Sequence, residues 1–130
     1  MKILKPVLIS IAVVFVIICG IYIAMFASTN SLMKYAESVF SGETIIENED
    51  NPLWRYSLSE RYFPETEIIE YDLKRIFVIH NFKEGKMNVL YRLHYADENG
   101  KTLYNSVAQS TWYIKKVDGE WVVYDIDEAP

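Results

Sequence analysis

The sequence predicts an α+β fold: an N-terminal transmembrane helix followed by one or two short helices packed on a curved antiparallel meander sheet. Two observations support it. The chain has 130 residues, of which 51% are hydrophobic, yet no charged residue occurs from position 6 to position 33. From about residue 67 onward, apolar and polar residues alternate in runs separated by turn signals, as they do in half-buried strands. These two unlike parts exclude both a uniform soluble globule and a multi-span membrane protein.

The first predicted element is a membrane span at 6–26, with the sequence PVLISIAVVFVIICGIYIAMF. As a helix, this segment would extend about 30 Å, the thickness of a bilayer core. Lys2 and Lys5 precede it, and no basic residue follows before Lys34, so the positive-inside rule places the N-terminus in the cytoplasm. The chain then divides into a cytoplasmic tail at 1–5, a transmembrane signal anchor at 6–27 that contacts the lipid bilayer, and an extracytoplasmic domain at 28–130, on a single-pass plasma-membrane protein.

Two kinds of processing are the alternatives to an uncleaved anchor. A cleaved signal peptide usually has an apolar region of about 7–15 residues, and this region is longer. Met25, which is not a small residue, stands two positions before Ala27, where cleavage would occur. Lipoprotein processing at Cys19 is disfavoured because Ile17 and Ile18 precede the cysteine where small residues are expected.

Small residues recur at spacing four in the second half of the span, at Gly20, Ala24 and Ser28. Residues with this spacing lie on one helix face, and small side chains there let two helices approach closely. The pattern therefore predicts a homodimer through these three residues.

The composition of the outer domain limits its environment and its partners. Cys19 is the only cysteine and lies inside the span, so the domain has neither a disulfide nor a thiol nucleophile. About 102 residues are enough for one hydrophobic core. Together with the absence of an N-x-Ser/Thr site, these features favour a bacterial envelope protein. The domain has 11 basic and 18 acidic residues, with no basic cluster larger than a pair, which argues against nucleic acid as a partner.

Helical spacing predicts a helix at 31–41, because Leu32, Met33, Ala36, Val39 and Phe40 fall on one face. We expect Ser31 or Asn30 as its N-cap and Gly42 in the left-handed position after its end. Residues 43–52 are acidic and irregular. Asn51 and Pro52 then resemble a cap followed by a first-turn proline, which predicts a short helix that ends before Pro64.

The strands follow in chain order. Residues 68–82 form one long strand or two, with a bulge at Lys74–Arg75 where the alternation slips. We expect a turn at 84–86, a strand at 87–96, and a tight turn at Asn99–Gly100. A strand at 102–116, a turn at Asp118–Gly119 and a last strand at 121–126 complete the meander.

The stretch from Lys116 to Trp121, KVDGEW, is followed by the apolar strand residues Val122 and Val123 and then by Tyr124 and Asp125. After an amphipathic helix and long bent strands, this ending resembles the small nuclear-transport-factor-two-like domains, also called cystatin-like or SnoaL-like. The resemblance covers about residues 31–127 and implies a cone or roll in which one face of the sheet lines a pocket. A subset of the bacterial relatives is also anchored in a membrane.

The cone that this resemblance implies could hold a catalytic site. His94, Asp125 and Tyr91 are the candidates for general acid–base chemistry of the isomerase or cyclase type, in which a carboxylate moves a proton and a hydroxyl stabilises an enolate. The alternative is that His94 is a partly exposed strand residue and Asp125 a solvated strand end. Two histidines without further ligands make no zinc site, and no nucleotide loop or serine triad pattern occurs, so we predict no metal and no cofactor.

Four aromatic residues lie in the least regular segment, at Trp54, Tyr56, Tyr62 and Phe63. If they are exposed together they form a surface for a ligand or protein partner, because aromatic anchors dominate interface energies. The alternative is that they plug one end of the sheet. The sequence contains no complete catalytic constellation, so we favour a non-catalytic binding or protein-interaction module over an enzyme. A subunit of an envelope complex is one form that such a module takes.

Overall fold

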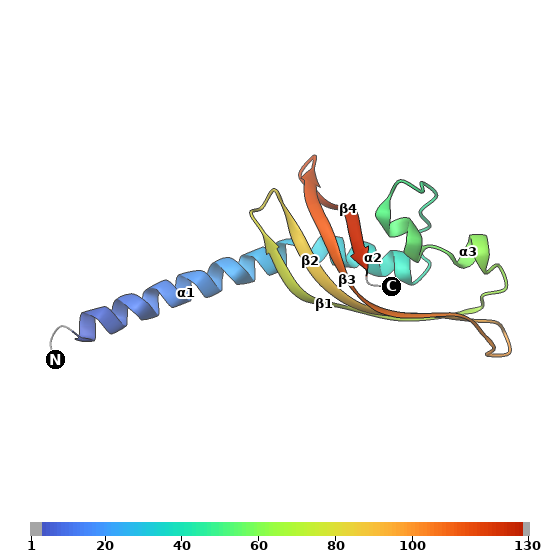
Figure 1. Cartoon of the computed structure of the whole chain (residues 1–130), viewed down its shortest axis with the longest axis horizontal. Helices are drawn as coiled ribbons and strands as arrows, with labels where there is room; N and C mark the ends of the chain where they lie inside the picture. The colour runs from blue at the N-terminus through green and yellow to red at the C-terminus, as the bar shows by residue number, and fades with distance from the viewer. Residues whose placement is uncertain (1–3, 129–130) are drawn as a thin grey trace.

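The computed structural model describes residues 4–128 and has the predicted α+β composition, with helices first and an antiparallel sheet second (Figure 1). The first helical part is one long helix that extends away from the rest of the molecule. The sheet and the remaining helices form a separate body at its C-terminal end. The elements are α1 (Leu4–Ser28), α2 (Asn30–Phe40), the 3-10 helix η1 (Pro52–Tyr56), α3 (Ser59–Tyr62), β1 (Ile68–His80), β2 (Glu84–Ala96), β3 (Thr102–Val117) and β4 (Glu120–Glu128).

Helix α1 is long and apolar enough to span a membrane. Its 25 residues extend about 37 Å at 1.5 Å per residue, and none of them is buried inside the protein. It is the one candidate span in the part of the chain that the structure describes, where it runs on into α2. A signal sequence near the N-terminus can meet the same criteria of length and composition, so α1 stands as a candidate span.

Helix α2 packs the predicted apolar face onto the sheet, with Ala36 in its middle and Phe40 at its end both fully buried. Gly42 has φ +87 and ends the helix in the expected left-handed conformation. The expected N-cap at Asn30 or Ser31 is wrong. Thr29 occupies that position without a side-chain cap, and its hydroxyl instead donates to the Phe26 carbonyl. The reason is that α2 continues almost directly from α1, whose last turn takes the place of a separate cap.

The four strands pair in the order β1-β2-β3-β4, and every pair is antiparallel. The sheet is open, so β1 and β4 are its edges. The register of β1 on β2 shifts between Arg75 and Phe77, one position from the predicted bulge. The predicted turns at Asn99–Gly100 and Asp118–Gly119 are confirmed, and both glycines have positive φ.

The expected turn at 84–86 is wrong, because the chain turns at 81–83. The Asn81 side chain accepts hydrogen bonds from the N–H groups of Lys83 and Glu84, and Phe82 adopts a positive φ of 66°. Gly85 already lies in β2, paired with His80. Position 85 has no room for a side chain, because a Cβ there would lie 2.1 Å from the Ile79 carbonyl oxygen.

The core lies between α2, η1 and one face of the sheet, which we call the inner face. As predicted, alternate residues of β2 from Met87 to Tyr95 point into it. Trp112 of β3 is fully buried at its centre and packs near the Phe40 and Tyr56 rings. No element that the structure describes covers the other, outer face, where Leu90 and Val107 are exposed.

Candidate functional site

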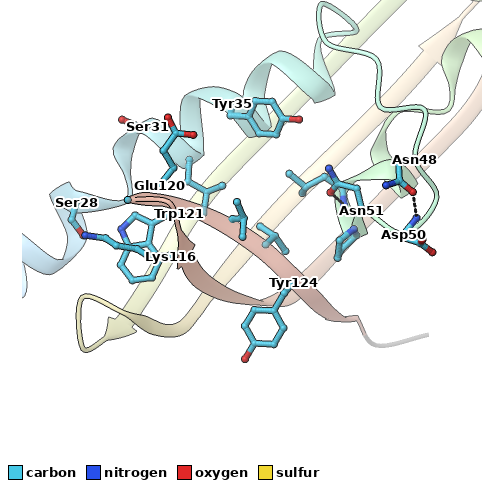
Figure 2. A pocket seen from close by; sticks show the side chains of 16 residues that line it. Ser28, Ser31, Tyr35, Asn48, Asp50, Asn51, Lys116, Glu120, Trp121 and Tyr124 are labelled. Atoms are coloured by element: carbon cyan, nitrogen blue, oxygen red, sulfur yellow. Dashed lines mark hydrogen bonds between the residues drawn. The ribbon is translucent and has the colours of Figure 1, made fainter.

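A groove of about 840 Å³ separates β4 from the helical layer. One wall combines Ser28 with the first turns of α2, a second is the segment 48–53, and the third is the edge strand β4. Figure 2 shows Lys116 and Trp121 near Ser28 at one end of the groove and Asn48, Asp50 and Asn51 at the other. The groove therefore runs along the free edge of the sheet.

Two asparagine turns shape the loop wall of the groove. The Asn48 side chain accepts a hydrogen bond from the Asp50 N–H at 2.9 Å, and the Asn51 side chain accepts one from the Leu53 N–H at 3.1 Å. The second bond is the helix cap that the sequence predicts at Asn51–Pro52. Leu53 is buried and attaches this loop to the core. The wall is thus held in place by its own local sequence.

The groove combines apolar side chains with a few charges. Leu32, Leu53 and Val123 supply apolar surface, while Asp50, Glu120 and Lys116 are the charged residues that line it. Among the described residues, no group of three or more His, Cys, Asp or Glu side chains is placed to hold a metal ion. Chemically, this lining is suited to hold an extended chain beside β4, because an edge strand presents unpaired backbone groups.

The three residues of the predicted acid–base site do not meet. Tyr91 points into the core, where its hydroxyl lies 3.3 Å from that of Ser106 and burial raises its pKa. His94 lies on the outer face, 3.0 Å from the Thr102 hydroxyl. Asp125 is exposed on β4, and its carboxylate accepts a bond from the N–H of the next residue.

The distance between His94 and Asp125 follows from the register. Their partners on β3 are Asn105 and Tyr113, eight residues apart, which corresponds to about 26 Å along a strand. A proton relay needs its groups within hydrogen-bond reach of one substrate. This arrangement therefore assembles no acid–base site from the three predicted residues.

A polar cluster that the sequence did not indicate lies on the inner face. Glu128, at the end of β4, accepts hydrogen bonds from the Tyr56 hydroxyl at 3.2 Å and from the Ser110 hydroxyl at 2.5 Å. Burial raises the pKa of Tyr56 to about 12. The cluster satisfies two hydroxyl groups inside the core, as buried polar groups require. No sequence signal links Glu128 to Tyr56, because the two are 72 positions apart.

The four aromatic residues predicted as one partner surface lie in two environments. Tyr56 is only 2% exposed, and its ring packs 4.6 Å from that of Phe40, so its assignment to a binding surface is wrong. Phe63 packs on Tyr95 and Tyr104 at the end of the sheet distant from α1. Trp54 and Tyr62 contact each other edge to face, and Tyr62 is exposed. Tyr56 and Phe63 thus follow the alternative in which the aromatics plug the sheet.

Arg75 and His80 of β1 connect the sheet to α1 at the junction between the two, and no pattern in the sequence indicates these contacts. The Arg75 guanidinium donates to the Phe26 carbonyl, the Thr29 hydroxyl and the Asn30 side chain. His80 is buried, and its Nε2 lies 2.7 Å from the Met25 carbonyl oxygen and 2.9 Å from the Ser28 hydroxyl. These bonds connect β1 to the end of α1 and to the start of α2.

The predicted dimer stripe is only partly available. Gly20 and Ala24 are exposed on α1, and a Cβ at Gly20 would meet no other atom within 4 Å. The Ser28 hydroxyl, however, is bonded within its own chain to His80. A second helix could therefore approach at Gly20 and Ala24, while Ser28 belongs to the junction.

Comparison with known proteins adds no family to these observations. No protein-family model, curated protein or solved structure matches the chain. The resemblance carried by Lys116–Trp121 stays a prediction, although these residues do form the expected β3–β4 hairpin.

Proposed function

We propose that this protein is a membrane-anchored binding module, with α1 as an uncleaved single-pass anchor and the domain at 28–130 outside the plasma membrane. The groove beside β4 binds an extended segment of a partner protein, as in a subunit of an envelope complex. Lys2 and Lys5 before the span support a cytoplasmic N-terminus. The homodimer through α1 remains a second, independent proposal at Gly20 and Ala24.

The groove along the free edge of β4 carries this proposal. Within the described chain, β4 pairs only with β3, so its outer edge is free to pair with another strand. An extended peptide added there gains main-chain hydrogen bonds from the edge, and its alternate side chains contact the groove wall. Leu32 and Val123 provide apolar contacts, and the carboxylates of Asp50 and Glu120 favour a basic residue in the partner.

The fold proposal is the cystatin-like cone that the KVDGEW ending resembles. In its support, the helical layer lies against one face of the sheet, and β1 to β3 bend around it (Figure 1). The inner face that would line a cone's pocket holds Trp112 and Tyr95, both almost fully buried. A binding role in the edge groove fits this filled interior better than the alternative acid–base chemistry on a small molecule.

Site-specific photo-crosslinking in host membranes tests the binding proposal. A photoreactive residue replaces Tyr35, which is exposed and lines the groove, and in a control chain replaces Val107 on the outer face. We expect a discrete protein adduct from position 35 only. Ser31→Trp, an exposed groove residue changed to fill the groove, should abolish the adduct. An adduct of equal yield from position 107, or one that survives Ser31→Trp, would overturn the groove as the binding site.

A further inference from the structure

The C-terminal half of β1 lies beside the last turns of α1, at the depth where a membrane span ends. The Phe77 ring is 6.3 Å from the Tyr22 ring, and the His80 N–H donates to the Met25 sulfur at 3.3 Å. A bilayer core of about 30 Å takes about 20 helical residues, so a span that begins at Pro6 leaves the core near residue 26. Phe77, beside Tyr22, therefore lies within about one helical turn of the boundary between acyl chains and headgroups.

Apolar side chains are exposed at this depth. Phe77 and Ile79 point to the outer face and are 40% and 48% exposed, and Phe82 in the β1–β2 turn is 41% exposed. Figure 1 shows this hairpin at the end of the sheet next to α1. In water such a group of exposed phenyl and aliphatic side chains is costly, whereas apolar side chains such as these gain by burial at the boundary between headgroups and acyl chains.

The hairpin holds Phe82 in a fixed and uncommon conformation. A positive φ is rare for a bulky residue and is found where a turn requires it. The Phe82 N–H donates to His80 Nδ1 at 2.9 Å, and its ring packs edge to face on the His80 ring. The Lys83 carbonyl accepts a bond from the Lys116 N–H at 2.8 Å. The turn is therefore ordered before any contact with lipid, and it presents the Phe82 ring outward.

The charge of this region is opposite to that of the domain. The segment 74–86 contains four basic residues and one acidic residue, within a domain of 11 basic and 18 acidic residues. Lys83 and Lys86 are exposed beside the apolar group. Basic side chains next to apolar ones favour an anionic lipid surface, because they are attracted to its negative potential.

We propose that Phe77, Ile79 and Phe82, with Lys83 and Lys86, form a lipid-contact surface that rests on the outer leaflet of the membrane spanned by α1. This inference rests on the proposed function, because it requires α1 to be in a bilayer. Together with the bonds of Arg75 and His80 to α1, the lipid-contact surface gives the domain two attachments and one orientation. The groove beside β4 would then be presented at a constant angle to the membrane.

Spin-label accessibility in proteoliposomes containing anionic lipid tests this inference on the full chain. Cys19 is the only cysteine, so Cys19→Ser provides the background for single labels at Ile79→Cys and Phe82→Cys. A label at Asn99→Cys, in the exposed turn at the opposite end of the sheet, is the matched control. We expect higher accessibility to oxygen than to a water-soluble nickel reagent at 79 and 82, and the reverse at 99.

A label at Val14→Cys separates the inference from the proposed anchor. If position 14 is in lipid while 79 and 82 resemble 99, the lipid-contact surface is wrong and the anchor stands. If position 14 is in water, the anchor proposal fails, and the lipid-contact surface fails with it. Phe82→Ser with the label at Ile79→Cys provides the second variant. It should lower the ratio of oxygen to nickel accessibility at 79, and an unchanged ratio would overturn the role of Phe82.

Discussion

Arg75 and His80 are the two β1 side chains that bond to the junction between α1 and α2, and Arg75→Met tests the contribution of the first. Its Nη1 donates to the Phe26 carbonyl at 2.9 Å and to the Thr29 hydroxyl at 2.6 Å. Its Nη2 donates to the Asn30 side chain at 2.7 Å, and the guanidinium lies 3.7 Å from the centre of the Phe26 ring. Burial lowers the pKa of Arg75, yet the guanidinium stays charged at every pH used in the assay.

The magnitude follows from these contacts. A hydrogen bond from a charged donor contributes about 1.5–3 kcal/mol, and a partly exposed cation–π contact about 0.5–1 kcal/mol. The bond to Asn30 is exposed and adds little. The cost of partly burying the cation offsets some of the stabilisation from the hydrogen bonds and the cation–π contact. A methionine also keeps part of the packing of the Arg75 stem. We therefore expect Arg75→Met to reduce the free energy of unfolding by about 2 kcal/mol.

Denaturant unfolding of the full chain in detergent micelles measures this loss. All three tryptophans lie beyond α1, so their fluorescence reports on the domain. Arg92→Met, at an exposed position on the outer face, is the control and should change stability by less than about 0.5 kcal/mol. If the two variants unfold at the same denaturant concentration, the assignment of Arg75 as a junction residue is refuted.

Two further predictions use the same preparation, and a third uses intact membranes. Gly85→Ala places a Cβ 2.1 Å from the Ile79 carbonyl oxygen and should cost more than about 2 kcal/mol. Gly100→Ala meets no atom within 4 Å at φ +81 and should cost only about 1–2 kcal/mol, so equal losses would contradict the close approach. Burial raises the pKa of Tyr56 to about 12, whereas the unfolded chain has a tyrosine pKa near 10. The stability that the protonated Tyr56 hydroxyl adds to the folded state is therefore complete below pH 10 and is lost as the pH rises toward 12. Over this pH range the Tyr56→Phe variant should therefore lose less stability than the unsubstituted chain, by up to about 3 kcal/mol in alkaline denaturation. Parallel curves of stability against pH for the two chains would contradict this. Replacing Lys2 and Lys5 by glutamine should produce a mixed orientation in protease-protection assays, and an unchanged orientation would contradict the role of these lysines.

Features that depend on neighbouring residues were predictable from the sequence. The charge-free run predicted α1, the spacing of Leu32 to Phe40 predicted α2, and strict alternation from Met87 to Tyr95 predicted which face of β2 is buried. Asn51–Pro52 and Asp118–Gly119 also form the predicted cap and turn. In each case a propensity or a period within a few residues determines the conformation.

Features that depend on distant residues were not predictable. Asn81 and Gly85 both favour a turn locally, and only the pairing of His80 with Gly85 decides where the chain reverses. The sequence near Tyr56 is compatible with an exposed side chain. Its burial depends on β3 and β4, which place Ser110 and Glu128 beside it. The bonds of Arg75 to Phe26 and Thr29 join positions 49 and 46 residues apart.

The candidate groove shows the same division. Its loop wall, with the turns at Asn48 and Asn51, follows from local side-chain chemistry. Its existence depends on how α2 and β4 are spaced by the core between them, which no pattern in either segment encodes. The expected site at His94 and Asp125 failed for a related reason, because alternation gives the face of a strand residue but not its position along the sheet relative to another strand.

The length of the strands has a consequence for the reach of the molecule. β1 and β2 have 13 residues each and β3 has 16, more than twice the usual strand length of about 5–6. At about 3.3 Å per residue, a 13-residue strand measures about 43 Å along its path. The turn at Asn99–Gly100 lies at the end of the sheet opposite α1 (Figure 1), so the sheet acts as a rigid spacer that holds this turn tens of ångströms from the end of the helix. In the proposed membrane-anchored arrangement, one end of the protein meets lipid, and the other reaches past the headgroup layer.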